Sequence, residues 1–497
     1  MESFDPIELS KQYTRESGAY WAAAGAETAL TLFQEAAKNV EAYADFLKKE
    51  NIDPATITSI EDFQKIPPAT KKNYFDAYSL PQLVLGGNIA QNYLICTSSG
   101  TSGKPHYWPR LKDQDTIEPA LIELMYNFLG LEPEKKTLII SCLAMGTWVA
   151  ANMMIDASLE IARKSNLNLS VITPGAMNRR QILDIVSDLG PYYDQLILIG
   201  YPPTIRNLIV EGKENGVHWP DYHPKLVVGG EPVTQHWKEF ILENIGSTCL
   251  TDIGVVFGMA ETHLVAYETP IASYIRALMT KHPRIAQELF KTTTVGALLQ
   301  FDPSRRWLEE VDGNLLLTAR TGIPMLRYAS GDKGGVYSFD ELIEKLSQHD
   351  INIYKVLEEH GIAKDTLWQW PFFYCNGRGD SVSIMGANLY PENIDKFFHA
   401  HPEIHDYKIS VRHSEAEEPE LWIYLELREH HELSPTEVDN FIVYAERELL
   451  DLFMTNNEDF LDAYNEEPAA MVPHITICPY NQAPFDIKQA KQQHVLK

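Results

Sequence analysis

Short apolar runs alternate with amphipathic stretches through the middle of the chain. Apolar runs occur at residues 137–141, 196–199 and 225–228. Between them, residues 151–164 and 178–189 place apolar side chains three or four positions apart, which is the spacing of one helix face. Strands that alternate with helices predict an α/β fold with a largely parallel sheet.

The two ends of the chain follow other patterns. Before residue 90, side chains such as Ala29, Leu32 and Phe33 recur at helical spacing and predict helices. Near the C-terminus, residues 409–411 and 421–427 have the apolar runs of strands, and a polar helical segment follows at residues 435–452.

This change of pattern predicts two domains. We place a large domain at residues 1–379 and a small α+β domain at residues 380–497. Residues 338–370 are rich in helix formers. A lid, an oligomer contact and simple padding are all consistent with that composition, and padding is the commonest for such insertions.

The composition excludes several classes of protein. Hydrophobic residues make up 44% of the 497 positions, and 42 Lys and Arg against 69 Asp and Glu give a net charge of −27. An excess of negative charge repels nucleic acids and anionic membrane surfaces, so we expect neither as a partner. The five cysteines form no Cys-x-x-Cys pair, which argues against a zinc site or a disulfide framework.

The N-terminus lacks a basic region followed by an apolar run, as a signal peptide would have. No stretch approaches the ~20 apolar residues that cross a bilayer. We therefore expect a cytoplasmic protein. The sequence leaves its oligomeric state open.

A segment rich in Ser, Thr and Gly follows the apolar run at residues 93–96. Small residues let backbone N–H groups approach a polyphosphate, and hydroxyl groups can donate further hydrogen bonds to phosphate oxygens. The segment lacks the Walker pattern, and an ordinary surface turn has a similar composition. The candidate phosphate-binding residues are Ser98, Ser99, Gly100, Thr101, Ser102, Gly103 and Lys104.

Together with this segment, four later motifs resemble those of the adenylate-forming enzymes, which include acyl-CoA synthetases, adenylation domains and luciferases. The five motifs lie at residues 98–105, 228–232, 257–261, 327–332 and 377–380 with 386–394. Gly-Glu-Pro in the second motif and the Asn-Leu-Tyr-Pro run in the last are similar to the phenylacetate–CoA ligase branch. The resemblance implies a large, multi-sheet α/β domain that binds ATP and an acid, and a small mobile α+β lid.

The resemblance also implies roles for single residues. Glu261 would be a catalytic carboxylate that holds Mg²⁺, Asp332 would accept hydrogen bonds from the ribose, and Arg378 would donate to the ribose or a phosphate. Apart from the family pattern, these side chains would serve as a helix cap or in surface ion pairs. The other candidate cofactor-binding residues are Gly229, Gly230, Glu231, Phe257, Gly258 and Gly386.

Adenine would lie between the glycines of the second motif and Phe257, although core packing is the alternative for Phe257. Gly386 would allow close approach of a pantetheine arm. A late lysine completes adenylation in this family by steadying the carboxylate against the α-phosphate. Lys488 is the candidate and Lys491 the second choice, with a solvated tail as the alternative.

Several positions depart from the family pattern. Phe257 and Ala260 stand where the family has Tyr and Ser or Thr, so one hydroxyl group near the phosphates is missing, and Thr262 is the candidate substitute. His106 follows the first motif in place of a lysine or a small polar residue. The interval between the fourth and fifth motifs is also long for this family.

The implied reaction is ATP-dependent activation of a carboxylic acid to an acyl-adenylate, followed by thioester formation with CoA and release of AMP and pyrophosphate. ATP, Mg²⁺ and CoA are the expected cofactors. Two alternatives stay open: an amide, ester or acyl-protein synthetase that does not use CoA, and a nucleotide-binding protein that has lost turnover.

We expect the acid pocket between residues 146–148 and the strand that leads to Phe257. Trp148, Met145 and Met259 predict a mainly apolar lining, which suits an aryl or medium acyl acid. The sequence does not choose among phenylacetate-like, benzoate-like and aliphatic acids.

Overall fold

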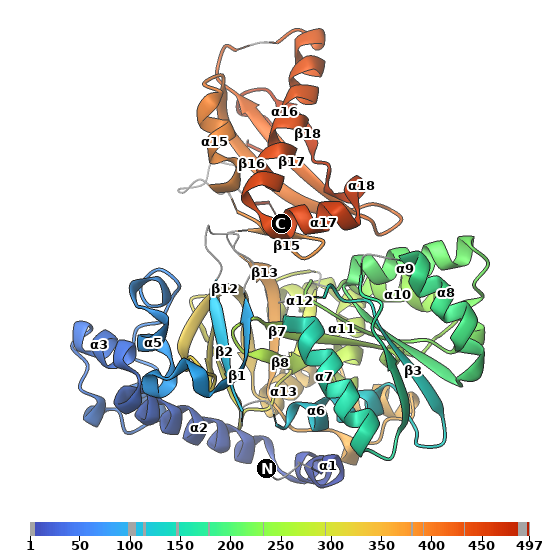
Figure 1. The fold of residues 1–497 in the computed structure, drawn as a ribbon. Coiled ribbons are helices and arrows are strands. Elements are labelled where there is room, and N and C mark those ends of the chain that lie inside the picture. Colours follow the sequence, from blue (N-terminus) through green and yellow to red (C-terminus); the bar gives the residue numbers. More distant parts are fainter. Residues whose placement is uncertain are drawn as a thin grey trace. The chain divides into compact units, whose positions relative to one another are not determined.

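The computed structural model describes most of the chain. The described residues are 5–97, 106–112, 116–145, 149–176, 179–231, 233–293, 295–378, 381–390, 392–431, 433–485 and 495–496. They divide into two compact units: a larger one of the residues up to Gly377 apart from His106, and a smaller one that combines His106 with the residues from Arg378 onward (Figure 1).

An eleven-stranded sheet forms the centre of the larger unit, in the order β10-β11-β12-β13-β9-β8-β7-β6-β5-β3-β4 (Figure 1). A separate two-stranded ribbon pairs β1 (Asn92–Thr97) with β2 (Tyr107–Leu111). The strands of the large sheet are β3 (Lys136–Ser141), β4 (Asn168–Ile172), β5 (Gln195–Gly200), β6 (Lys225–Gly229), β7 (Ile253–Met259), β8 (His263–Tyr267), β9 (Ala297–Gln300), β10 (Arg306–Val311), β11 (Asn314–Ala319), β12 (Met325–Tyr337) and β13 (Phe372–Arg378).

The expectation of a largely parallel sheet is right for only one part of it. Strands β4, β3, β5, β6 and β7 pair in parallel, whereas β7–β8, β8–β9, β9–β13, β10–β11 and β11–β12 are antiparallel. The length of the connections explains the difference. Three residues join β7 to β8, and two residues, Asp312 and Gly313, join β10 to β11. Connections this short can link only antiparallel strands.

Helices cover both faces of the parallel part, and two separate apolar cores result. Neighbouring strand residues point to opposite faces, so Ile139 and Ile197 belong to one core and Leu138 and Leu196 to the other. Burial on both faces is why β3 contains the uninterrupted apolar run 138–140 and β5 the run 196–199. The first core includes α6 (Glu118–Phe128) and α7 (Val149–Lys164), and the second α8 (Arg179–Leu189), α9 (Pro202–Glu214) and α10 (Gln235–Ile245).

The N-terminal segment is helical, as its apolar spacing predicts. At the start of the longest of its helices, the Ser17 side chain accepts a hydrogen bond from the backbone N–H of Tyr20. Along this helix, a Cβ added to Gly25 would lie 2.9 Å from the Trp307 ring of β10, so the close packing depends on glycine. The helices are α1 (Pro6–Arg15), α2 (Gly18–Asn39), α3 (Glu41–Lys49), α4 (Ile60–Phe63) and α5 (Leu80–Leu83).

Residues 338–370 pack on the larger unit with one face and expose the other. They include α13 (Phe339–Gln348) and α14 (Ile353–Glu359), whose Leu342, Leu346 and Leu357 are buried in one cluster with α11 (Pro270–Lys281) and α12 (Pro283–Phe290). A segment that shares a buried cluster with neighbouring helices agrees better with a structural insertion, the padding named above, than with a lid.

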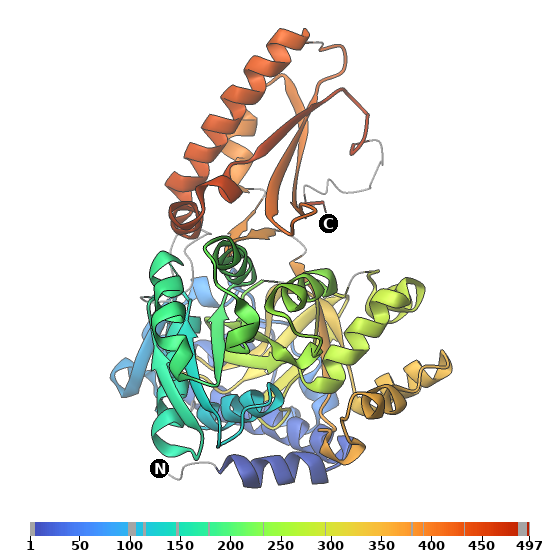
Figure 2. The same cartoon turned by 90° about the vertical axis from the view of Figure 1, so that its right-hand side faces the viewer.

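The smaller unit contains a three-stranded sheet and a two-stranded one. The strands expected at residues 409–411 and 421–427 and the helix expected at 435–452 are present. Figure 2 shows α16 along one face of the three-stranded sheet. The elements are β14 (Val382–Ile384), β15 (Ala387–Leu389), α15 (Glu392–Ala400), β16 (Ile404–His413), β17 (Pro419–Leu427), α16 (Pro435–Asn456), α17 (Glu458–Glu466), α18 (Pro468–Met471) and β18 (His474–Cys478).

These elements confirm the predicted fold class, a larger α/β unit with more than one sheet and a smaller α+β unit. Over the residues that the structure describes, no helix is both long enough and apolar enough to span a bilayer.

Candidate functional site

The second motif lies at the end of β6, beside β7. Gly229 pairs with Val256, and a Cβ added to Gly229 would lie 2.6 Å from the Val256 carbonyl oxygen. Gly230 has φ +88°, and a Cβ there would lie 2.4 Å from the Tyr201 ring. Both glycines are therefore required by packing, and Gly230 also by its backbone conformation. Glu231 follows them and is partly exposed.

The third motif begins in β7 and ends in the turn before β8. The Phe257 ring is half-buried, with its centroid 5.3 Å from that of Phe373 in a T-shaped pair. This contact is the core packing that the sequence left as an alternative, and it leaves part of the ring exposed. Gly258 is exposed, and a Cβ there would lie 2.9 Å from the His263 carbonyl oxygen.

Glu261 occupies the turn between β7 and β8 and is only 6% exposed. The Tyr328 hydroxyl group donates a 3.0 Å hydrogen bond to Glu261 Oε1. This bond joins the third motif to the fourth, although 67 positions separate the two residues in the sequence.

Two buried arginines hold the backbone of this turn. Arg110 donates from Nη1 to the Glu261 carbonyl oxygen at 3.3 Å and from Nη2 to the Thr262 carbonyl oxygen at 3.5 Å. Arg306 donates from Nη2 to the same Thr262 oxygen at 3.0 Å. Hydrogen bonds from charged donors are stronger than neutral ones, so the position of Glu261 is closely defined.

Next to the turn, His263 lies between two other buried side chains. Its Nδ1 is 3.2 Å from Glu118 Oε2, and its Nε2 is 3.7 Å from Cys96 Sγ. Glu118 Oε1 is 3.9 Å from Arg110 Nη2. His263 also has φ +60°, a conformation uncommon for residues other than glycine.

Sequence reasoning missed Arg110, Glu118, Arg306 and His263. These residues lie far apart in the sequence or outside any motif, so only the folded chain brings them together. The position of His263, two residues after Glu261, was the one signal that local reasoning had available.

The fourth motif serves the fold as well as the site. Asp332 is 7% exposed and accepts a hydrogen bond from the Ser330 hydroxyl group. Arg327 has φ +49°, and its Nε is 3.2 Å from Glu309 Oε2. Burial raises the pKa of the Glu309 carboxyl group, and Arg327 opposes this shift. Arg327 is therefore bound within the unit rather than exposed to a ligand.

The candidate residues of the smaller unit lie near its first hairpin. Arg378 donates from Nη1 to the Tyr390 hydroxyl group at 2.5 Å. Gly386 has φ +85°, and a Cβ there would meet nothing within 4 Å. The backbone conformation, rather than crowding, therefore accounts for this glycine.

Thr262, the candidate for the missing hydroxyl group, is fully buried, and its Oγ1 has no hydrogen-bond partner in the described part of the chain. Its hydroxyl group does not face solvent and does not replace the one missing at Ala260. Several other predicted positions lie outside the described residues. They are Ser98, Ser99, Gly100, Thr101, Ser102, Gly103, Lys104, Trp148, Lys488 and Lys491.

The donor set near Glu261 suits a magnesium ion that is held mainly by a substrate. Mg²⁺ is usually bound by one or two carboxylates together with phosphates and water. Glu261 supplies one buried carboxylate. Among the described residues, no group of three or more His, Cys, Asp or Glu side chains is placed to hold a metal ion.

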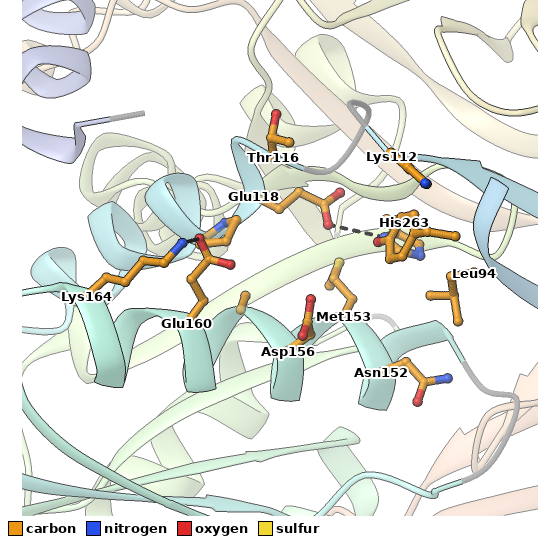
Figure 3. A pocket seen from close by; sticks show the side chains of 13 residues that line it. Leu94, Lys112, Thr116, Glu118, Asn152, Met153, Asp156, Glu160, Lys164 and His263 are labelled. Atoms are coloured by element: carbon orange, nitrogen blue, oxygen red, sulfur yellow. Dashed lines mark hydrogen bonds and ion pairs between the residues drawn. The ribbon is translucent and has the colours of Figure 1, made fainter. Parts of the chain in front are cut away.

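A cavity of about 610 Å³ opens in the larger unit beside α7 (Figure 3). Asn152 and Asp156 of α7 line one side of it, and Leu94, Glu118 and His263 line others. Its lining therefore includes charged and amide side chains as well as apolar ones.

The sequence placed the acid pocket next to residues 146–148, which lie outside the described part of the chain. Met145 is 50% exposed at the surface and Met259 packs on the second core of the large sheet, and neither lines the cavity.

No protein-family model matches the chain, and no curated protein does either. Solved structures do. 2-Hydroxyisobutyryl-CoA ligase in complex with 2-HIB-AMP and CoA, in the thioesterification state, matches with a TM-score of 0.61 at 15% identity, over 97% of this chain and 90% of the other. The same ligase in the postadenylation state with 2-HIB-AMP matches with a TM-score of 0.51 at 16% identity, over 100% of this chain and 90% of the other.

The fold is therefore that of the adenylate-forming enzymes. At this level of identity the likeness defines the fold and not the reaction.

Proposed function

We propose that the protein activates a carboxylic acid with ATP to form an acyl-adenylate and then transfers the acyl group to CoA, with release of AMP and pyrophosphate. The Gly-Glu-Pro and Asn-Leu-Tyr-Pro sequences favour an enzyme of the phenylacetate–CoA ligase type. In this proposal residues 1–379 bind ATP and the acid, and residues 380–497 form a mobile lid.

The observation that carries the proposal is the hydrogen bond between Tyr328 and Glu261, 3.0 Å long. It joins two motifs that are remote in the sequence, and the strand that carries Glu261's motif pairs with the strand that ends in Gly229. A scaffold protein would have no chemical need for a buried carboxylate placed where these motifs converge.

Each residue has a defined role in the proposal. Glu261 would hold Mg²⁺, which neutralises phosphate charge in the attack of one anion on another. Asp332 would bind the ribose and Arg378 the ribose or a phosphate. Lys488 would steady the carboxylate against the α-phosphate.

Free CoA is the proposed acceptor of the acyl group. The structural match is to a CoA ligase captured with CoA, which is consistent with this choice. An amide, ester or acyl-protein synthetase is the alternative within the same chemistry.

The test is acid-dependent exchange of pyrophosphate into ATP across a panel of acids, followed by measurement of AMP release with and without CoA. We expect exchange with at least one acid class and CoA-dependent AMP release. Glu261→Gln keeps the shape of the side chain but removes its charge, and should lower exchange by on the order of 100-fold.

Glu358→Gln, on the exposed end of α14, is the matched control and should leave exchange unchanged. Exchange without CoA turnover would redirect the search to amine or protein acceptors. Normal exchange by the Glu261→Gln protein would refute the metal role, and binding of Mg-ATP without exchange would favour a protein that has lost turnover.

A further inference from the structure

We propose that the cavity beside α7 receives the carbon skeleton of the acid and selects acids that carry a hydroxyl or amino group on it. This inference rests on the proposed acid-activating function and names its class of substrate.

The position of the cavity fits this role. His263 lines it and is the first residue of β8, two residues after Glu261 in the turn that precedes this strand. Leu94 also lines it, from the strand β1 that leads toward Ser98. One wall of the cavity is thus continuous with residues assigned to the adenylation site.

The lining has an apolar and a polar part. Leu94, Met153 and Ala157 offer apolar surface to a carbon skeleton, and Asn152 and Asp156 project from the same helix α7 (Figure 3). A site of this kind binds the skeleton by apolar contact and uses a few polar groups to fix its orientation.

The polar wall around His263 is rigid. Glu118 and His263 are 5% and 2% exposed, and the 3.2 Å contact between them fixes the imidazole ring. Figure 3 shows the Glu118 side chain extending toward His263 at the edge of the cavity. A polar group fixed in this way is prepared for a ligand without further ordering cost.

Two charges on the cavity wall stay unpaired within the described part of the chain. Asp156 and Lys112 are exposed and form no ion pair there, whereas Glu160 and Lys164 of the same wall pair with each other at 2.8 Å. The wall therefore offers both an acceptor and a donor to a substituent on the acid.

An unsubstituted aryl or alkyl acid would cover the side chains of Asp156 and Lys112 without replacing the hydrogen bonds that they make to water. Sites built to bond a substrate hydroxyl or amino group reject analogues that lack it. The polar lining thus argues for a substituted acid over an unsubstituted aryl or medium acyl one.

The test compares matched acids in the pyrophosphate exchange assay: phenylacetate against its 4-hydroxy and 4-amino forms, and hexanoate against its 6-hydroxy and 6-amino forms. We expect kcat/KM for at least one substituted form to exceed that of its parent by tenfold or more, the ratio that one hydrogen bond supplies. The amino forms test the acceptor at Asp156, whereas the hydroxyl forms can bond to either Asp156 or Lys112.

Asn152→Leu should reduce the ratio of kcat/KM between the substituted acid and its parent by about tenfold. Asp156→Asn should lower kcat/KM for the amino-substituted acids of the panel and not for the others. Asp184→Asn, on the exposed side of α8 and outside the cavity, is the matched control and should change neither.

Equal or better exchange of the unsubstituted parents would overturn the inference and leave the proposed function standing. Exchange with none of the acids would overturn both. Direct binding, measured as the shift in Tm produced by each acid, gives a readout independent of turnover. A shift that Asn152→Leu leaves unchanged would count against the cavity.

Discussion

Lys238 is a fully buried lysine outside the proposed site that shares its carboxylate partner with a second cation. Its Nζ is 2.8 Å from Glu268 Oε2, and Arg276 Nη2 is 3.1 Å from Glu268 Oε1. Two cations thus share one carboxylate, and the buried cluster carries a net charge of about +1. Burial lowers the pKa of Lys238 from 10.5 to about 8, against the opposing effect of Glu268.

This cluster predicts a pH dependence of stability. Between pH 8 and 10.5 the unfolded chain binds the Lys238 proton more tightly than the folded one, so the free energy of unfolding should rise with pH. The full increase in the free energy of unfolding over this pH range is on the order of 3 kcal/mol. The check is to measure Tm of the wild type and of Lys238→Met at pH 7.5 and 9.5. Between these pH values the Tm of the wild type should rise relative to that of the variant. A constant difference would contradict the assignment.

The candidate site was only partly accessible to sequence reasoning. Glu261 and Asp332 stand within ordered motifs and could be named from them. Arg110 and Glu118 could not, because a buried arginine in β2 acquires its partners only when the strand lies beside the turn of β7 and β8. The polar lining of the cavity was missed for the same reason.

At the scale of elements, β16 anchors the chain on both sides of the candidate lysine. Lys408 donates to the Pro484 carbonyl oxygen at 2.7 Å, and its Nζ lies 5.1 Å above the centre of the Phe485 ring. Beyond residues 486–494, Val495 forms a bridge with Ile409. The two flanks of the segment that contains Lys488 are therefore fixed to one strand.

If Lys488 completes adenylation, loosening this anchor should slow the reaction. Lys408→Met removes the hydrogen bond and the cation–π contact, and we expect kcat for exchange to fall about tenfold with KM for ATP unchanged. Lys396→Met, at an exposed position of α15, is the control. An unchanged kcat in a folded Lys408→Met protein would show that the anchor does not position the lysine.

Sequence patterns predicted the elements better than their pairing. Alternating apolar runs and amphipathic stretches gave β3, β5, α7 and α16, because burial and helical spacing are properties of single segments. Strand direction depends on the connection, and the three-residue link between β7 and β8 was hidden inside a motif assigned to chemistry. The antiparallel part of the sheet was therefore missed.

At the scale of the whole molecule, each unit has hydrophobic clusters of its own. Buried residues of the smaller unit, such as Ile394, Leu425 and Leu449, cluster with one another. Those of the larger unit form separate clusters around the large sheet and around α11 to α14. A domain with its own core can fold alone.

We therefore expect a fragment of residues 378–497 to fold without the rest of the chain. It should give a circular dichroism spectrum with helix and strand and a single cooperative thermal transition. The matching fragment of residues 1–377 should bind ATP, if the proposed assignment of ATP to this unit is right. A random-coil spectrum of the smaller fragment would show that its core needs the larger unit.

The two arginines at the Glu261 turn donate to its backbone carbonyl oxygens. Every residue supplies a carbonyl oxygen, so the turn keeps this support when its side chains are exchanged. The position of Ala260 is therefore open to redesign. Ala260→Ser would introduce a hydroxyl group on a backbone that is already held in place, which makes this turn a starting point for engineering the catalytic rate or a new acceptor.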